Sequence, residues 1–201
     1  MTSNLQNQLS CFISPGLVSK LSKIYFENEA LLTKAIEASV CAVLMGLYNR
    51  IEDVKLYDEL MQLIANSEFY GGINFESKKV QTLNNSFDEE GHGPLNIIFV
   101  NKKDRIAEMI SNEVGVRSET ACALLNLSVM VVLSYFKNKN KNLKELQLLL
   151  EEQKNKILNA TPQGIRLILG FSTFEIIEEH SQTSFTSNIF SFFSIKKQTS
   201  Y

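Results

Sequence analysis

The sequence has few of the residues that most metal and redox sites require. It contains three cysteines, Cys11, Cys41 and Cys122, and none of them forms the CxxC pair of a zinc knuckle or a thioredoxin-like site. Its two histidines, His92 and His180, each lack a second histidine three or four residues away, which argues against a histidine-based zinc site. The sequence therefore predicts no bound metal and no cofactor.

Motifs of several enzyme classes are missing as well. There is no GxSxG nucleophile elbow, and there is no GxGxxG or GxxxxGK[ST] phosphate loop. Cys41 and Cys122 lie within apolar runs, where a thiol more often acts as a small buried hydrophobe than as a nucleophile. We therefore predict a non-enzymatic protein, and its cysteine usage suits a reducing compartment.

The charge balance and the apolar runs limit the partners and the location. With 20 Lys+Arg against 22 Asp+Glu, the net charge of −2 gives no electrostatic reason to bind nucleic acid. No lysine or arginine precedes Lys20, so the N-terminus does not resemble a secretory signal. The internal apolar windows are interrupted before the roughly 20 residues that a membrane-spanning helix needs. These features predict a cytoplasmic protein, with peripheral association to the envelope as an alternative.

What the sequence does contain is apolar periodicity with helical spacing, and this pattern occurs twice. Residues 17–50 align with residues 106–139 without a gap, and their apolar positions largely coincide, which indicates an internal duplication. The predicted fold is an all-α helical bundle of two pseudo-repeated units, each with a short amphipathic helix, a long buried apolar helix and a closing amphipathic helix. The predicted helices, in that order, span 16–26, 29–49 and 53–66 in the first unit and 103–114, 118–138 and 142–158 in the second.

Residues that are typical of helix ends give the predicted boundaries of these helices. Gly115 suits a left-handed helix stop, and Ser118 suits the N-cap of the second long helix. A further short helix is expected from Gln163 to Gly170 after Pro162. The predicted segments are an N-terminal segment (1–14), a first helical unit (15–70), a polar linker with little packing capacity (71–93), a second helical unit (94–180) and a flexible Ser/Phe-rich tail (181–201).

The tail carries a cluster of aromatic residues ahead of Lys196 and Lys197. Three interpretations remain open: a disordered terminus, a segment that docks on a partner, or a contact with a membrane surface. The candidate partner-binding residues are Phe190, Phe192, Phe193 and Ile195.

Several motifs resemble the YidB-like bacterial domain family of unknown function. They are the run Gly93–Ile106, the apolar stretch Ala121–Leu133, the turn Thr161–Ile165 and, in the first unit, the stretch Ala35–Leu47. Together the resemblance covers residues 15–170. It implies an all-α domain without an established activity, and some relatives are fused to OmpA-like peptidoglycan-binding modules. The resemblance supplies no catalytic residues.

These observations favour a non-enzymatic helical interaction or scaffold protein with a protein partner, and a homo-oligomer is an open alternative. A second hypothesis is an envelope-associated or membrane-surface structural protein. A third is an enzyme with an acidic site, for which the candidate acid and base groups are Glu175, Glu178, Glu179 and His180. Glu175 and Glu179 are four residues apart and would share a helix face, although such a pair is usually a solvated helix end.

Overall fold

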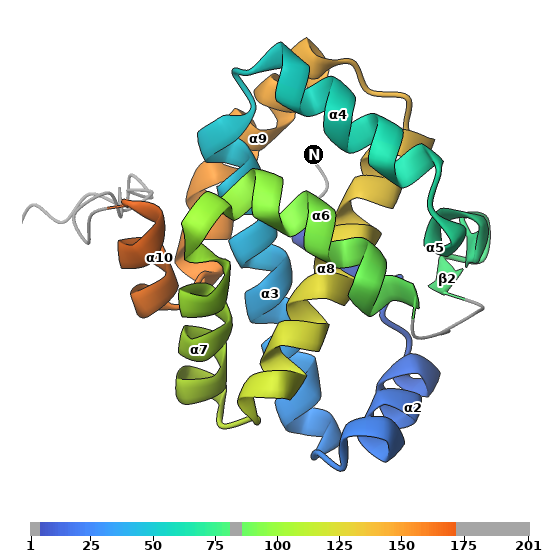
Figure 1. Cartoon of the computed structure of the whole chain (residues 1–201), viewed down its shortest axis with the longest axis vertical. Coiled ribbons are helices and arrows are strands. Elements are labelled where there is room, and N and C mark those ends of the chain that lie inside the picture. Colours follow the sequence, from blue (N-terminus) through green and yellow to red (C-terminus); the bar gives the residue numbers. More distant parts are fainter. Residues whose placement is uncertain (1–4, 81–85, 172–201) are drawn as a thin grey trace, which may run out of the picture.

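The computed structural model describes residues 5–80 and 86–171, and most of them are helical (Figure 1). The elements in chain order are α1 (Leu5–Ser10), α2 (Pro15–Tyr25), α3 (Glu29–Arg50), α4 (Val54–Ala65), α5 (Glu68–Gly71), β1 (Ile73–Asn74), β2 (Lys79–Val80), α6 (Ser86–Phe99), the 3₁₀ turn η1 (Val100–Lys102), α7 (Lys103–Val114), α8 (Ser118–Asn138), α9 (Leu143–Ala160) and α10 (Gln163–Leu169). The all-α prediction is confirmed, because the described strands form only one two-residue hairpin with Ile73 paired to Val80.

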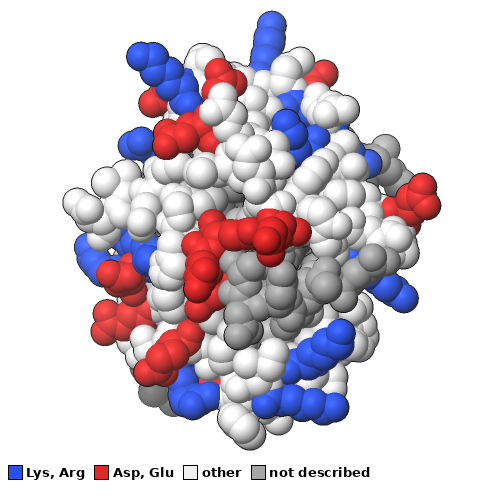
Figure 2. Space-filling model, turned by 45° about the vertical axis from the view of Figure 1, so that its right-hand side comes forward, with Lys and Arg blue, Asp and Glu red and all other residues white. Residues whose placement is uncertain are grey.

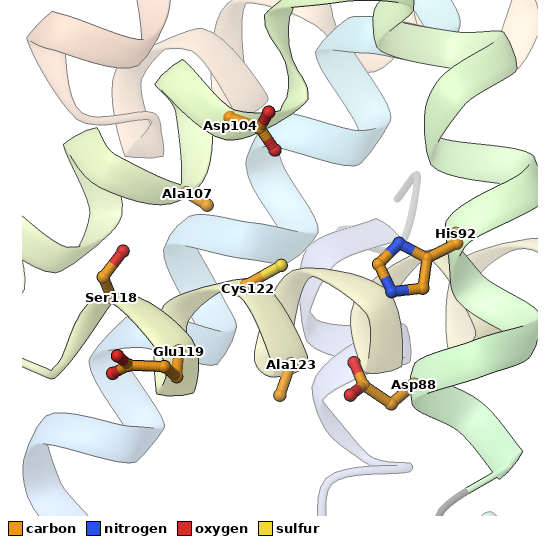
Figure 3. Close-up of a pocket in the computed structure, with 8 residues that line it drawn as sticks. All are labelled: Asp88, His92, Asp104, Ala107, Ser118, Glu119, Cys122 and Ala123. Carbon is orange, nitrogen blue, oxygen red and sulfur yellow. The ribbon is translucent and has the colours of Figure 1, made fainter.

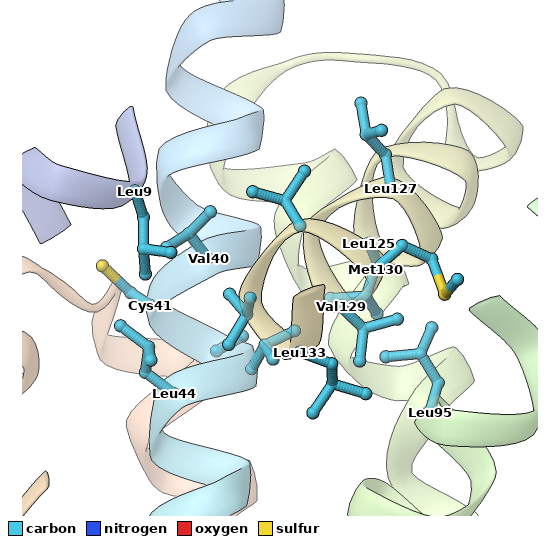
Figure 4. Packing of buried hydrophobic residues seen from close by; sticks show 14 of the residues in the cluster. Leu9, Val40, Cys41, Leu44, Leu95, Leu125, Leu127, Val129, Met130 and Leu133 are labelled. Atoms are coloured by element: carbon cyan, nitrogen blue, oxygen red, sulfur yellow. The ribbon is translucent and has the colours of Figure 1, made fainter. Parts of the chain in front are cut away.

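The two long helices form the centre of the molecule. Helix α8 packs most extensively against α3 and α6, while α9 covers another side of α3 (Figure 1). Figure 4 shows the apolar side chains that meet between these helices, among them Val40 and Leu44 of α3, Leu95 of α6 and Leu133 of α8. Helices that are apolar on nearly all sides are stable only inside a core, and this packing provides that environment.

The short, long and closing helices occur in the predicted order in both halves of the chain. Helices α2, α3 and α4 contain 11, 22 and 12 residues, and α7, α8 and α9 contain 12, 21 and 18. The sequence therefore predicted the type and approximate bounds of these six helices. That they arose by duplication stays a prediction.

Helix α6 is the main difference from the predicted organisation. Residues 71–93 were expected to be a polar linker with little packing capacity, but their last part forms the first turns of α6, and Phe87 is buried. Pro94 lies inside this helix and removes one backbone hydrogen bond. The burial of α6 against α8 outweighs that loss, so the expectation of weak packing was wrong.

Gly91 explains how α6 approaches α8 so closely. A Cβ atom at this position would lie 2.7 Å from Cβ and 2.8 Å from both Cα and O of Asn126 on α8. Because two of these three atoms belong to the backbone, no side-chain rotation could make room. Gly91, predicted to lie in a linker, is therefore required by a helix–helix contact.

The predicted caps are partly confirmed. Gly115 ends α7 with a φ of 87°, in the left-handed region that favours glycine. Ser118 is the first residue of α8 and not its N-cap, which is Arg117, and no side-chain hydrogen bond caps the helix locally. Instead, Glu27 supplies the missing acceptor from the corner between α2 and α3.

Glu27 binds the start of α8 through one carboxylate oxygen. Oε1 accepts hydrogen bonds from the backbone N–H of Arg117 at 2.8 Å, from Arg117 Nε at 3.3 Å and from Thr120 Oγ1 at 3.4 Å. The hydrogen bond from the Arg117 backbone does most to lower the pKa of Glu27 below its ordinary value of 4.5. The turn between α2 and α3, in the first half of the chain, thus caps α8 in the second half.

Both long helices also meet the length and composition of a membrane span, contrary to the expectation from their interrupted apolar windows. Of their most apolar windows, however, 72% in α3 and 89% in α8 is buried inside the protein itself. The core helices of soluble proteins pass the same test, so this feature is weak evidence for a membrane location.

Candidate functional site

A pocket of about 420 Å³ opens where α6, α7 and α8 meet (Figure 3). Helices α6 and α7 reach it with acidic side chains and an imidazole, and α8 contributes a thiol, a hydroxyl and a carboxylate. The lining residues are Asp88, His92, Asp104, Ala107, Ser118, Glu119, Cys122 and Ala123. The pocket therefore gathers three carboxylates, a set that favours a cationic ligand.

Two of the polar side chains of the pocket already have partners in the protein. Lys103 Nζ lies 2.8 Å from His92 Nδ1, and because an ammonium group can only donate, this ring nitrogen accepts. Asp88 Oδ1 accepts from Asn126 Nδ2 at 2.5 Å, and Asn126 is fully buried. These contacts join α6 to α7 and to α8, so Asp88 and His92 have a structural role at the pocket wall.

The thiol in the pocket is not activated for nucleophilic attack. Burial raises the pKa of Cys122, Lys103 lowers it, and Asp88 and Asp104 raise it further. Asp88 and Cys122 also contribute to a raised pKa of Tyr25 nearby, after burial as the main cause. Cys122 is therefore a thiol at neutral pH, whereas catalytic cysteines have a lowered pKa.

The other two cysteines differ in exposure. Cys41 is fully buried in α3, and burial raises its pKa to about 12. Cys11 is exposed, and none of these three cysteines forms a disulfide in the part of the chain that the structure describes. The prediction of a buried reduced thiol is confirmed for Cys41, while Cys122 is only half-buried.

Within residues 5–80 and 86–171, His, Cys, Asp and Glu side chains do not gather in a group of three or more that could hold a metal ion. Acidic side chains nevertheless concentrate locally on the surface. In the view of Figure 2, several of them form a band at the centre of the face, and others lie toward its edges among the lysines and arginines. The surface therefore carries local negative charge, although the net charge of the chain is small.

A second and larger hollow, the α3–α9 groove, lies between the C-terminal end of α3 and the first half of α9. It measures about 630 Å³, within the range of roughly 300–1,000 Å³ that ligand sites occupy. Its lining residues are Tyr48, Asn49, Ile51, Glu52, Lys144, Gln147, Leu148 and Glu151. Leu148 is 62% exposed, although it lies on the helix whose Leu146 and Leu150 are buried in the core.

Polar contacts fix the walls of this groove. Gln147 Nε2 donates to the carbonyl oxygen of Ile51 at 3.1 Å, which holds α9 against the end of α3. A hydrogen bond with Glu151 is the largest cause of the raised pKa of Tyr48, and Lys154 Nζ lies 5.0 Å from the centre of the Tyr48 ring. The groove is therefore a preformed surface that presents an exposed leucine beside an anchored tyrosine.

The structure does not place the functional candidates that the sequence indicated. Phe190, Phe192, Phe193 and Ile195 fall outside the described residues, and so do Glu175, Glu178, Glu179 and His180. Sequence reasoning missed the α6–α7–α8 pocket, because its residues are far apart in the chain. One signal for the groove was present: three consecutive leucines, Leu148 to Leu150, cannot all face one core.

Comparison with known proteins identifies the family of this chain. The model of a family described as bacterial protein of unknown function (DUF937) matches residues 7–139. The chain belongs to this family. The DUF937 match confirms the YidB-like resemblance and ends just after α8, so it contains the whole α6–α7–α8 pocket and only the α3 side of the groove. No curated protein and no solved structure matches the chain significantly.

Proposed function

We propose that this DUF937 protein is a non-enzymatic, cytoplasmic interaction protein, and that its α3–α9 groove binds an apolar segment of a protein partner. The observation that carries this proposal is the exposure of Leu148 in a preformed groove. An exposed leucine on its own is ordinary, whereas one inside a hollow of about 630 Å³ beside a half-buried tyrosine resembles the anchor pockets of peptide-binding sites.

The chemistry of the α6–α7–α8 pocket supports a binding role over catalysis. The thiol of Cys122 is held protonated, and the hydrogen bond described for His92 goes to Lys103 and not to a nucleophile. Nucleophilic catalysis needs a nucleophile within hydrogen-bond reach of a base. The acidic lining instead suits a small cation or a basic side chain.

The groove is tested by quantitative pull-down from a native bacterial lysate with the full-length protein and two matched variants. Leu148→Glu places a charge in the groove. Leu167→Glu places the same charge on α10, at a leucine that is 57% exposed. The proposal predicts that partners captured by the natural protein are lost with Leu148→Glu and retained with Leu167→Glu. Equal capture by both variants would refute the groove as the binding surface.

The tail residues are a second candidate contact. Replacing Phe190, Phe192, Phe193 and Ile195 together with serine tests them in the same pull-down. If partner binding runs through the tail, capture falls in this variant. The membrane-surface alternative predicts tail-dependent binding to anionic liposomes, and its absence would remove that alternative.

A further inference from the structure

The α3–α9 groove adjoins the point at which the described chain ends. Tyr48, which lines the groove, packs against the ring of Phe171 with 6.2 Å between the ring centres. Asn49, another lining residue, donates from Nδ2 to the carbonyl oxygen of Leu169 at 2.9 Å. These contacts tie the last described turn to the end of α3. The described chain therefore ends at the edge of the groove, and residues 172–201 are joined to it there.

The tethered residues contain the kind of segment that such a groove accepts. Ile189 to Ile195 holds three phenylalanines and two isoleucines, and two lysines follow directly. Apolar anchors at short intervals are the means by which peptide segments bind grooves. Burying aromatic side chains of this kind gives the largest hydrophobic gain per residue.

Acidic side chains of the groove suit the basic end of the segment. Glu52 and Glu151 line the groove with Lys144, and Lys154 lies 5.0 Å from the centre of the Tyr48 ring. In the sequence, Lys196 and Lys197 follow the apolar cluster, and no acidic residue lies between Ile189 and Lys197. The two carboxylates can therefore pair with these lysines, while the apolar contacts carry most of the binding.

The tether makes binding within the chain favourable. An extended chain covers at most about 3.3–3.6 Å per residue, so the residues between Phe171 and Ile189 allow a reach of up to roughly 60 Å. A covalent connection that can bridge the distance gives an effective concentration of up to the order of millimolar. A segment joined to the edge of a groove therefore occupies it even when its intrinsic affinity is weak.

We propose that residues 189–197 of this chain occupy its own α3–α9 groove and act as an internal competitor of the external partner. This inference rests on the proposed function, because it takes the groove to be the partner-binding surface. It assigns the aromatic segment a regulatory role, in which a partner binds by displacing the segment.

The absence of tryptophan allows a direct test in the full-length chain. Phe193→Trp introduces a single fluorophore into the segment, and Phe26→Trp, at a residue that is 88% exposed, gives the emission of a tryptophan in water. The inference predicts that Phe193→Trp emits at shorter wavelength than this reference. It also predicts a return to the reference wavelength on addition of Leu148→Glu, but not of Leu167→Glu.

Three results would overturn the inference. The first is emission of Phe193→Trp at the reference wavelength. The second is a blue-shifted emission that Leu148→Glu leaves unchanged. The third is a blue shift that disappears on dilution, because this would place the segment in the groove of a second copy. The pull-down distinguishes failure of this inference from failure of the proposed function. If Leu148→Glu loses the partner while the tryptophan of Phe193→Trp is exposed to water, the groove binds a partner but residues 189–197 do not occupy it. If the segment is an internal competitor, partner capture should also increase when Phe190, Phe192, Phe193 and Ile195 are replaced with serine.

Discussion

Helices α3 and α8 are similar in length and apolar character, but the protein uses them differently. Helix α8 is buried along almost its entire length, is capped by Glu27 from a distant corner and carries the buried Asn126 that binds Asp88. Helix α3 is capped by its own neighbour Asn28, whose Oδ1 accepts from the Ala30 N–H at 2.8 Å, and its far end forms one wall of the groove. Helix α8 is therefore a core helix along its length, while the far end of α3 also forms a wall of a surface groove.

The close approach of α6 to α8 gives the largest expected effect on stability. Gly91→Ala places a methyl group against the backbone of Asn126 and should lower the free energy of unfolding by about 2 kcal/mol, the overpacking cost less the gain in helix propensity. Chemical denaturation measures this loss. The control is Gly93→Ala on the same helix, where the new Cβ would meet only Leu63 Cδ1, at 3.8 Å, and we expect a gain of up to about 1 kcal/mol.

The distant cap of α8 is the next largest effect. Glu27→Gln should cost about 1 kcal/mol at neutral pH, because a neutral amide replaces the carboxylate that accepts at the helix start. Since folding lowers the pKa of Glu27, its contribution is complete above the ordinary pKa of 4.5 and is lost as the pH falls through the lowered value.

Denaturation of both proteins over a range of pH measures this dependence. The stability difference between the natural protein and Glu27→Gln should be constant above pH 4.5 and shrink below it. Glu108→Gln, at an exposed position on α7, is the control for removing a carboxylate and should change the free energy of unfolding at neutral pH by less than about 0.5 kcal/mol. A difference that grew on acidification would contradict the cap.

The local cap of α3 should have a similar or slightly smaller effect. Asn28→Ala removes the acceptor of the Ala30 N–H and should cost up to about 1 kcal/mol, whereas Asn28→Asp keeps an acceptor and should be close to neutral. Thermal unfolding of the two variants measures the difference. Equal loss in both would show that the side-chain hydrogen bond is not what stabilises this end.

The groove should give the smallest effect on stability. Leu148→Glu should change the free energy of unfolding by less than about 0.5 kcal/mol, since its side chain is already exposed. The matched change Leu150→Glu, two residues further along α9, buries a charge at a fully covered position and should prevent stable folding. Similar stability of the two variants by circular dichroism would contradict the described face of α9.

Much of the fold follows from local patterns that the sequence displays openly. The bounds of α7 and α8 agree with the apolar periodicity, and Gly115 marks the helix end as expected. Helix α6 could not be predicted in this way, because its glycines and Pro94 have unfavourable helix propensity and the helix is stabilised by packing against α8 and other helices. The sequence predicted Ser118 as the N-cap of α8. The contact with Glu27 could not be predicted, because Glu27 comes close to that helix only in the folded protein.

The candidate sites depend still more on tertiary structure. The α6–α7–α8 pocket unites Asp88 with Cys122, and the α3–α9 groove unites Tyr48 with Leu148, across long stretches of chain. No spacing in the sequence encodes these pairs. The run of leucines in α9 did indicate that one of them must be exposed, but not what would lie beside it.

The most direct test of the binding surface is photo-cross-linking from the groove of the full-length protein in its native lysate. Benzoylphenylalanine is introduced in place of Leu148 and, separately, in place of Leu167 as the control. We predict specific cross-links from position 148, either to residues 189–197 of the same chain or to a partner protein. We predict no such cross-links from position 167. Cross-linking from position 148 that does not exceed the control would contradict the assignment of the α3–α9 groove as the interaction surface.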